Sequence, residues 1–394
     1  MNLLLKPGGI VEQKTILILG GYGNTGKPLA RLLLQETGVR LVLAGRNVEK
    51  ARQHATELNQ AFDENRVTGA YADASDTNSL RQAFTGIDFT VMASSTTQYT
   101  RQVATMALEA RIGYLDIQYS TQKIALLKSM ADEIQQAGCC FVTDGGFHPG
   151  LPAFLVRYVA QKFDQLVSAR VGSVIKEDWK SLDVEDPTVY ELVELMNDFE
   201  MSAFKAGKWK KASLVGMSDY LRMDFGGEFG RQYCAPMMLE EMRALPQMFP
   251  TLKETGFYVG SFNWFVDWVI MPVALVAMKL SPHFAIRPMA RWMHWGLNTF
   301  SNPPYGTMLK VEARGEVNGQ PKRMHVALAH PDGYMFTAIP VAACLLQYLD
   351  GSIARPGLWL QAHIVEPNRF MSDMQRMGIS IKTAEGGSNE MEPE

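Results

Sequence analysis

Short apolar runs alternate with helical patterns over the first third of the chain. The runs predict strands at 15–19, 40–44, 67–71, 89–93 and 139–143. The segments between them predict helices at 28–35, 48–59, 78–84, 102–110 and 122–136. Strands that alternate with helices form βαβ units around a parallel sheet. The pattern therefore predicts an α/β fold for this part of the chain.

The pattern changes from about His148, where a Pro-Gly-Leu-Pro break precedes an apolar helix predicted at 153–163. Further strands are predicted at 166–175, 208–215, 231–235 and 256–262. Asn318-Gly319 predicts a hairpin between 308–317 and 322–330, because Asn-Gly supplies the positive φ angles of a two-residue turn. An apolar helix at 338–349 follows. This half predicts a mostly antiparallel sheet.

A glycine-rich turn joins the first predicted strand to the first predicted helix. It contains the motif G-x-G-x-x-G, in which the glycines permit a tight turn, close approach to a pyrophosphate and close packing of helix on strand. Exposed N–H groups at the helix start then meet the anion. The sequence predicts a dinucleotide site, and a glycine-rich turn without a ligand is the alternative. The residues assigned to the cofactor here are Gly21, Tyr22, Gly23, Asn24, Thr25 and Gly26.

The second predicted strand ends in Ala44-Gly45-Arg46, with no acidic residue before Glu49. A site for the 2′-hydroxyl of NAD places Asp or Glu near this point. A guanidinium instead suits a 2′-phosphate, which a carboxylate repels. The sequence therefore predicts NADP(H) as the cofactor. The alternative is that Arg46 is a solvated surface charge.

The next two strand ends complete the predicted cofactor site. Asp73 and Ala74 follow the third strand, where adenine contacts usually fall, although Asp73 also suits a turn or cap. Ser94 and Ser95 follow the fourth strand, where the nicotinamide half would pass close to small residues. A Ser/Thr-rich loop without contact to the cofactor is the alternative for this pair.

Four segments together resemble one family of proteins. The runs GGYGNTG, LAGR, ADASD and GGFHPGLP are similar to those of the saccharopine dehydrogenase-like (saccharopine reductase-type) oxidoreductases. The likeness is most specific over 14–160 and returns weakly near 355–359. It implies a Rossmann domain with an inserted α+β domain, the chain returning to the first domain near its end. It also implies NADP-dependent reduction that joins an amino group to a carbonyl, or reduction of lipid-like enones in more distant relatives.

Two departures from the amino-acid-processing members argue against the saccharopine reaction itself. His148 stands where a small acidic residue is expected, and 257–295 is apolar and aromatic without a cluster of arginines.

The division predicted for the chain has three parts. Residues 1–147 and 337–382 form the Rossmann domain, 148–336 the inserted substrate and dimerisation domain, and 383–394, acidic and rich in Gly, Ser and Glu, a disordered tail.

Composition narrows the function classes. The 394 residues are 47% apolar and carry a net charge of −3, which argues against a nucleic-acid-binding protein that works by bulk electrostatics. The four cysteines include no C-x-x-C pair and are expected to be reduced thiols, which suits a cytoplasmic protein. The seven histidines show no metal-binding spacing, so no metal site is predicted.

For hydride transfer, a protein needs mainly to orient the cofactor and the substrate and to supply one proton donor. Two candidate donors sit at strand ends on the cofactor side of the predicted sheet, Tyr119 and His148. Imidazole titrates near neutrality, so His148 could protonate a developing carbanion, amine or alkoxide. The alternative is a loop histidine that caps the following helix.

The segment 257–295 contains four of the seven tryptophans, and Pro272 and Pro282 should break or kink its helices. Its longest charge-free apolar run, 268–278, is too short to span a membrane. It is expected either to fill the core or a homodimer interface, to border an apolar substrate cavity, or to lie on a membrane surface. The leading interpretation is an NADP(H)-dependent oxidoreductase that acts on a small molecule. Its substrate is either an imine or carbonyl compound or an apolar enone. The alternatives are a non-catalytic NADP-binding sensor and a peripheral membrane-associated protein.

Overall fold

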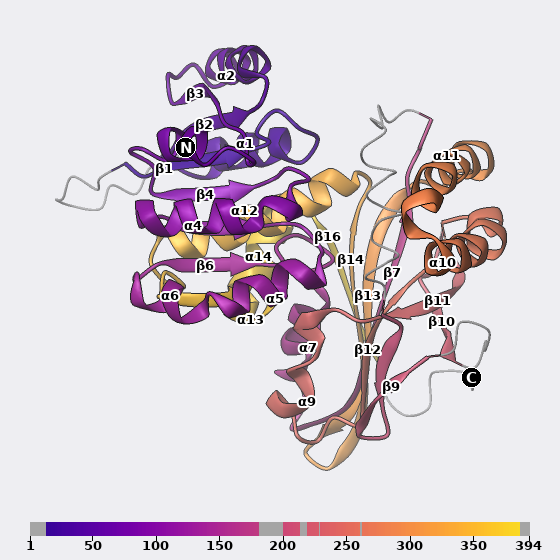
Figure 1. The fold of residues 1–394 in the computed structure, drawn as a ribbon. Coiled ribbons are helices and arrows are strands. Elements are labelled where there is room, and N and C mark those ends of the chain that lie inside the picture. The colour runs from indigo at the N-terminus through magenta and orange to yellow at the C-terminus, as the bar shows by residue number, and fades with distance from the viewer. Residues whose placement is uncertain (1–12, 181–199, 213–218, 228, 261, 387–394) are drawn as a thin grey trace.

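A seven-stranded parallel sheet organises the first part of the chain in the computed structural model, which describes residues 13–180, 200–212, 219–227, 229–260 and 262–386 (Figure 1). The strand order is β15-β6-β5-β4-β1-β2-β3, and every neighbouring pair is parallel. The predicted α/β fold is confirmed. The strands are β1 (Thr15–Leu19), β2 (Arg40–Gly45), β3 (Val67–Tyr71), β4 (Phe89–Met92), β5 (Gly113–Asp116), β6 (Cys140–Thr143) and β15 (Gly357–Leu360).

Helices cover both faces of this sheet, which explains why its strands are continuous apolar runs. On β1, Ile16 and Ile18 pack into one core cluster with Leu29 of α1, whereas Leu17 and Leu19 pack into another on the opposite face. The helices that connect the strands are α1 (Gly26–Glu36), α2 (Val48–Phe62), α3 (Thr77–Ala83), α4 (Thr100–Ala110), α5 (Thr121–Ser129) and α6 (Ala131–Gln136), with a short 3₁₀ turn η1 (Thr97–Tyr99) before α4.

The chain leaves this sheet after β6 and returns to it near its end. α12 (Gly333–Leu349) packs against α1, and β15 then pairs with β6. The two remaining helices of this return are α13 (Gln361–Ile364) and α14 (Pro367–Arg376). The buried face of α12 includes Phe336, Ile339 and Val341, which join the same core cluster as Ile16.

The intervening segment, together with one strand near the end of the chain, builds a second, mixed sheet of nine strands. Its main path is β10-β11-β12-β7-β13-β14-β16, with β8 and β9 beside β12. Only the β12–β7 pair is parallel among the described pairs of this sheet, so it is mostly antiparallel as predicted. The strands are β7 (Gln165–Lys176), β8 (Ser202–Lys205), β9 (Lys208–Lys211), β10 (Leu221–Asp224), β11 (Arg231–Met237), β12 (Glu254–Val259), β13 (Gly306–Val317), β14 (Gln320–His330) and β16 (Ser380–Gly386).

The predicted hairpin is confirmed as β13 and β14, which pair from Thr307–His330 to Val317–Gln320. Asn318 and Gly319 form its turn with φ angles of 52° and 71°. The helix α7 (Pro152–Ala160) packs on β7 and β13 and contacts the 3₁₀ turn η4 (Glu240–Met242), which the short helix α9 (Leu245–Met248) follows in the chain. Residues 213–215 of the strand predicted at 208–215 lie outside the described residues.

The prediction of a disordered tail from 383 is wrong for 383–386. These residues belong to β16, which pairs with β14 from Ala329–Ser380 to Arg323–Gly386. β16 is an edge strand with mostly exposed side chains. Main-chain hydrogen bonds order such a strand even where the side chains are polar, so composition alone misses it. Residues 387–394 lie outside the described part.

The apolar segment that follows β12 forms a separate group of helices at the margin of the molecule, away from the parallel sheet (Figure 1). They are a π-helical turn η5 (Val266–Ile270), α10 (Met271–Leu280) and α11 (Pro282–Phe300). Pro282 starts α11, as predicted, and Pro272 lies in the first turn of α10 directly after the π-helical turn. None of the described helices is long and apolar enough to cross a membrane.

Candidate functional site

The glycine-rich turn between β1 and α1 has no room for side chains. A Cβ at Gly26 would lie 2.1 Å from the carbonyl oxygen of Gly20, and one at Gly21 would lie 2.9 Å from Leu43 Cδ2. Gly20 itself has a φ of 88°, and its carbonyl accepts a 2.9 Å hydrogen bond from the Gly23 N–H. The start of α1 is therefore held directly against the end of β1.

The start of α1 fits a bound phosphate. No side chain caps the N–H groups of its first turn, and Thr25 at the cap position makes no such bond. The first turn also contains no acidic residue. Pro28 has no N–H and the Lys27 N–H already donates to the Gly23 carbonyl at 3.0 Å, so it is mainly the positive end of the helix dipole that attracts an anion here. The residues present therefore fit the pyrophosphate of a dinucleotide.

Tyr22 joins this turn to the end of β2. Its hydroxyl accepts a hydrogen bond of 3.0 Å from the Asn47 N–H. A Cβ at Gly45 would lie 2.6 Å from the same hydroxyl, so the glycine is what lets the ring approach the strand. Tyr22 thereby places Arg46, which is exposed to solvent, beside the glycine-rich turn.

Asp73 lies at the end of β3, close enough to Arg46 to be influenced by its charge. Hydrogen bonds from the Ser75 N–H (2.9 Å) and hydroxyl (2.8 Å) lower the pKa of this carboxyl, and the charge of Arg46 lowers it further. Asp73 thus holds its own turn together, which was one of the two roles expected of it. Ala74 beside it is buried.

Ser94 and Ser95 follow β4 and lie next to the glycine-rich turn. A Cβ at Gly20 would come within 2.9 Å of Ser94 Cβ. The Ser94 hydroxyl shares a 3.2 Å hydrogen bond with Thr96, and its carbonyl accepts from the side chain of Gln118. Ser95 is exposed. The residues predicted for the cofactor thus gather at the carboxyl edge of the parallel sheet, where ligands bind in open α/β folds.

A contact from the C-terminal part of the chain reaches this site and was not predicted. Tyr334 of α12 hydrogen-bonds the side chain of Asn24; burial raises the pKa of its phenol, and this bond acts in the opposite direction. One residue earlier, the Gly333 N–H donates to Glu177 at 3.1 Å, and the same Glu177 oxygen accepts from Thr307 on β13. The second sheet is therefore linked through α12 to the glycine-rich turn.

His148 lies where the two sheets meet. Its ring packs edge-on against Phe147, with centroids 3.9 Å apart, and is 5.6 Å from the ring of Phe257 on β12. Burial lowers the pKa of this imidazole to about 4. The expectation that it titrates near neutrality is therefore wrong, because the ring is buried among apolar neighbours such as Phe147 and Phe257. Its Nε2 is buried and has no hydrogen-bond partner among the described residues.

Tyr119, the other predicted donor, also connects the two sheets, since it follows β5 and reaches the residue after β11. Its hydroxyl donates at 3.4 Å to the carbonyl of Met238, the residue after β11. The ring is partly buried and packs on the main core cluster. The two candidate donors therefore both lie at the junction of the sheets, on the carboxyl side of β5 and β6.

A buried charged cluster at the ends of β5 and β6 was not predicted. The Lys123 ammonium donates to Asp116, to the Gln118 carbonyl and, at 2.9 Å, to Asp144 Oδ1, and the Thr143 hydroxyl donates to Asp116 at 2.8 Å. Burial raises the pKa of Asp144 to about 6. Burial opposes the charge of Lys123, but the two carboxylates outweigh it and raise its pKa. The sequence signal was an Asp at the ends of two neighbouring strands.

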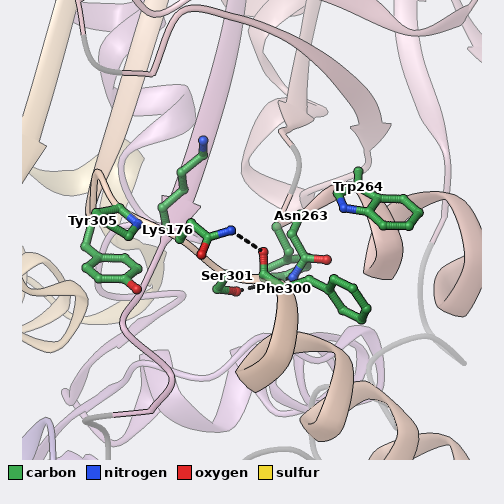
Figure 2. Close-up of a pocket in the computed structure, with 9 residues that line it drawn as sticks. Lys176, Asn263, Trp264, Phe300, Ser301 and Tyr305 are labelled. Atoms are coloured by element: carbon green, nitrogen blue, oxygen red, sulfur yellow. Dashed lines mark hydrogen bonds between the residues drawn. The ribbon is translucent and has the colours of Figure 1, made fainter.

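A pocket of about 230 Å³ lies at the end of β7 beside the start of the helical group (Figure 2). Asn263 is fixed in its wall, since its amide donates to the Ser301 hydroxyl at 3.2 Å and its oxygen accepts from the Val266 N–H at 2.9 Å. Much of the wall is polar, which differs from the apolar substrate cavity that was one of the three alternatives for 257–295. The lining residues are Lys176, Phe262, Asn263, Trp264, Phe300, Ser301, Asn302, Pro303 and Tyr305.

The described residues contain no group of three or more His, Cys, Asp or Glu placed to hold a metal ion. The four cysteines are free and buried. Burial raises the pKa of the Cys140 thiol to about 11 and that of Cys234 to about 12. These thiols are poor nucleophiles at neutral pH.

Residues 16–142 match the family model described as the saccharopine dehydrogenase NADP-binding domain. The fold resembles that of apo saccharopine dehydrogenase (L-Glu forming) from Saccharomyces cerevisiae, with a TM-score of 0.68 and 15% identity over 95% of this chain and 100% of that chain. DAP dehydrogenase from C. glutamicum aligns with a TM-score of 0.47 and 12% identity, over 92% of this chain and 98% of that one. No curated protein matches the sequence closely enough to count as a relative.

The chain thus combines a Rossmann-like fold with a second, mixed sheet. Residues 16–142 match the saccharopine dehydrogenase NADP-binding domain model, and the fold resembles that of saccharopine dehydrogenase over 95% of the chain. The resemblance seen in the motifs is confirmed. The predicted cofactor, NADP(H), agrees with this domain family.

Proposed function

We propose that the chain is an NADP(H)-dependent oxidoreductase that transfers hydride to an imine, a carbonyl or an apolar enone. The observation that carries this proposal is the crowded glycine-rich turn, which presents an uncapped helix start to a pyrophosphate. NADPH, when bound, would supply the hydride. The saccharopine dehydrogenase fold and the NADP-binding domain family support an enzyme of this general class.

In this proposal each strand end holds one part of the cofactor. Gly21 to Gly26 would hold the pyrophosphate, and Arg46 would donate to the 2′-phosphate from its exposed position beside Tyr22. Asp73 and Ala74 would border the adenine, and Ser94 and Ser95 would allow the nicotinamide half to pass. The positions of these residues around one edge of the sheet support the assignment.

The junction of the two sheets would hold the substrate. With its lowered pKa, His148 is a neutral imidazole at neutral pH, so it would act as a hydrogen-bonding group rather than as an imidazolium acid. Its unpaired Nε2 is the free position for a substrate atom. Tyr119 is then the better candidate for the proton donor, since a phenol is protonated at neutral pH and can release a proton to a developing anion.

The division of the chain is also proposed with one revised boundary. The nucleotide-binding part would comprise 13–147 and 337–379 of the described residues, and the substrate part 148–336 together with β16. The pairing of β15 with β6 and of β16 with β14 supports this boundary. The homodimer and the cytoplasmic location stay predictions, and light scattering at micromolar protein tests the first.

Two measurements test the function. Calorimetric titration should show binding of NADPH, and a screen that follows NADPH absorbance should then find turnover with amino-acid plus oxo-acid pairs or with lipid-like enones. Tyr119→Phe should reduce turnover while leaving NADPH affinity unchanged. Failure to bind NADPH would reject the proposal. Tight binding without turnover of any substrate class would instead favour the sensor.

A further inference from the structure

Large apolar side chains that are exposed to solvent gather on the helical group η5–α10–α11. Seven of the eleven such residues in the described part of the chain belong to 264–295. Leu280 and Phe284, at the turn between α10 and α11, are 81% and 84% exposed. We call these seven residues the apolar face: Trp264, Trp268, Val273, Val276, Leu280, Phe284 and Trp295.

Packing within the helical group does not account for the apolar face. The three helical segments already have a core of their own, in which Val266, Ile270 and Met293 are buried. The apolar face is composed of other residues of the same helices. Trp264 and Trp295 contact the ring of Phe300, but each of the seven residues remains at least 44% exposed. Soluble monomers seldom leave a large contiguous apolar area in water without a binding partner.

The charged residues of the segment 268–300 are all of one sign. Residues 268–300 contain Lys279, Arg287 and Arg291 but no Asp or Glu. Arg287 and Arg291 are exposed on α11. The acid nearest in sequence, Asp267, turns inward and accepts a 3.1 Å hydrogen bond from the Phe262 N–H. The described surface of 268–300 therefore combines exposed apolar side chains with the cationic Arg287 and Arg291, and this segment contains no acidic residue.

This charge pattern favours an anionic lipid surface over a second copy of the chain as the partner of the apolar face. A second copy docked face to face would bring arginines of like charge together, which opposes association. An anionic lipid surface instead attracts the arginines, accepts the apolar side chains below its headgroups and suits tryptophan at the boundary. The pattern is that of helices which lie in a membrane interface.

We propose that the helical group η5–α10–α11 docks the protein on the surface of a bilayer that contains anionic lipid. Leu280 and Phe284 enter the acyl region at the turn between the helices, and Trp264, Trp268 and Trp295 lie at the headgroup level. Arg287 and Arg291 bind headgroup phosphates. The inference does not depend on the proposed enzymatic function, because it uses only this surface and its charges.

Vesicle flotation tests the inference with the full chain. Wild-type protein should float with vesicles of phosphatidylcholine and phosphatidylglycerol at 7:3, about tenfold less with phosphatidylcholine alone, and less again in 0.5 M NaCl. Leu280→Asp with Phe284→Asp should reduce the bound fraction at least tenfold, and Arg287→Glu with Arg291→Glu should do so only on the anionic vesicles. Met248→Asp, an exposed apolar residue of α9, is the matched control and should bind as wild type does.

Folding and self-association are checked separately. The NADPH affinity and circular dichroism of each variant should equal those of the wild type, since the changed side chains are exposed. Wild-type protein that fails to float on anionic vesicles would overturn the inference. A dimer in sedimentation equilibrium that Leu280→Asp with Phe284→Asp dissociates would also overturn it, because the apolar face would then be covered by a second copy.

Discussion

The Lys123 ammonium lies 2.9 Å from Asp144 Oδ1, and both side chains are almost completely removed from solvent. The same ammonium also pairs with Asp116, so one buried cation serves two buried carboxylates. The cluster joins α5 to the ends of β5 and β6, and the loop Gly145–His148 follows Asp144 directly in the chain. A buried pair adds little net stability over apolar residues, but removal of one partner leaves an uncompensated charge.

Lys123→Met should therefore lower the free energy of unfolding by about 3–5 kcal/mol, measured by urea denaturation. Lys128→Met, on the same helix, is the control. Lys128 pairs with Glu240 but is 55% exposed, so its loss should cost less than about 1 kcal/mol. Adding Asp144→Asn to Lys123→Met should recover part of the loss. Equal effects of the two lysine substitutions would show that the buried cluster is not a stabilising unit.

Gly26→Ala should disturb the glycine-rich turn. The added Cβ would lie 2.1 Å from the Gly20 carbonyl oxygen, and backbone must shift to accept it. We expect a loss of roughly 1–3 kcal/mol in stability and weaker NADPH binding by calorimetry. Gly38→Ala is the matched control, since no atom lies within 4 Å of its Cβ and its stability should be unchanged or slightly increased. A Gly26→Ala protein that binds NADPH normally would contradict the proposed phosphate site.

Arg46 should determine the choice between the two nicotinamide cofactors. A hydrogen bond to a charged group contributes about 1.5–3 kcal/mol, which corresponds to roughly a 10- to 100-fold preference for NADPH over NADH. Arg46→Asp should remove this preference, because the new carboxylate repels the 2′-phosphate. Arg287→Asp makes the same change of net charge on α11 and should leave the preference intact. Equal affinity of the wild type for both cofactors would refute the assignment of Arg46.

The parallel sheet could be predicted from sequence because its strands are covered on both faces. Thr15–Leu19 and Val67–Tyr71 agree with the structure at both ends. The apolar pattern gives no bounds for β5, which has four residues and begins at a glycine. It also misses β16, whose order comes from main-chain pairing with β14 rather than from apolar side chains.

In the candidate site, too, features set by neighbouring residues could be predicted, whereas features set by contacts between distant parts of the chain could not. The glycine-rich turn follows from seven consecutive residues, and the structure shows steric need for glycine at Gly26. The lowered pKa of His148 depends on Phe257, more than 100 positions away, and on burial that no local pattern reveals. The contact between Asn24 and Tyr334 likewise joins distant parts of the chain. Such properties arise from packing, which the sequence pattern does not specify.

Asp267 should make the stability of the protein depend on pH near neutrality. Burial raises the pKa of its carboxyl to about 7, although the Phe262 N–H and the charge of Lys176 act in the opposite direction. Its Oδ2 is buried and has no hydrogen-bond partner among the described residues, which favours the protonated form. An acid whose pKa is raised on folding stabilises the native state at low pH, and this stabilisation is lost as pH rises through the folded pKa.

The free energy of unfolding of the wild type should therefore fall between pH 6 and pH 9, by about 1.4 kcal/mol relative to Asp267→Asn. The variant keeps an oxygen that can accept from the Phe262 N–H, but it cannot ionise. Urea denaturation at the two pH values gives the difference. Asp132→Asn on α6, which changes an exposed carboxyl in the same way, is the control, and its difference from wild type should be the same at both pH values. If Asp267→Asn follows the wild type at both pH values, the Asp267 carboxyl does not titrate in this range.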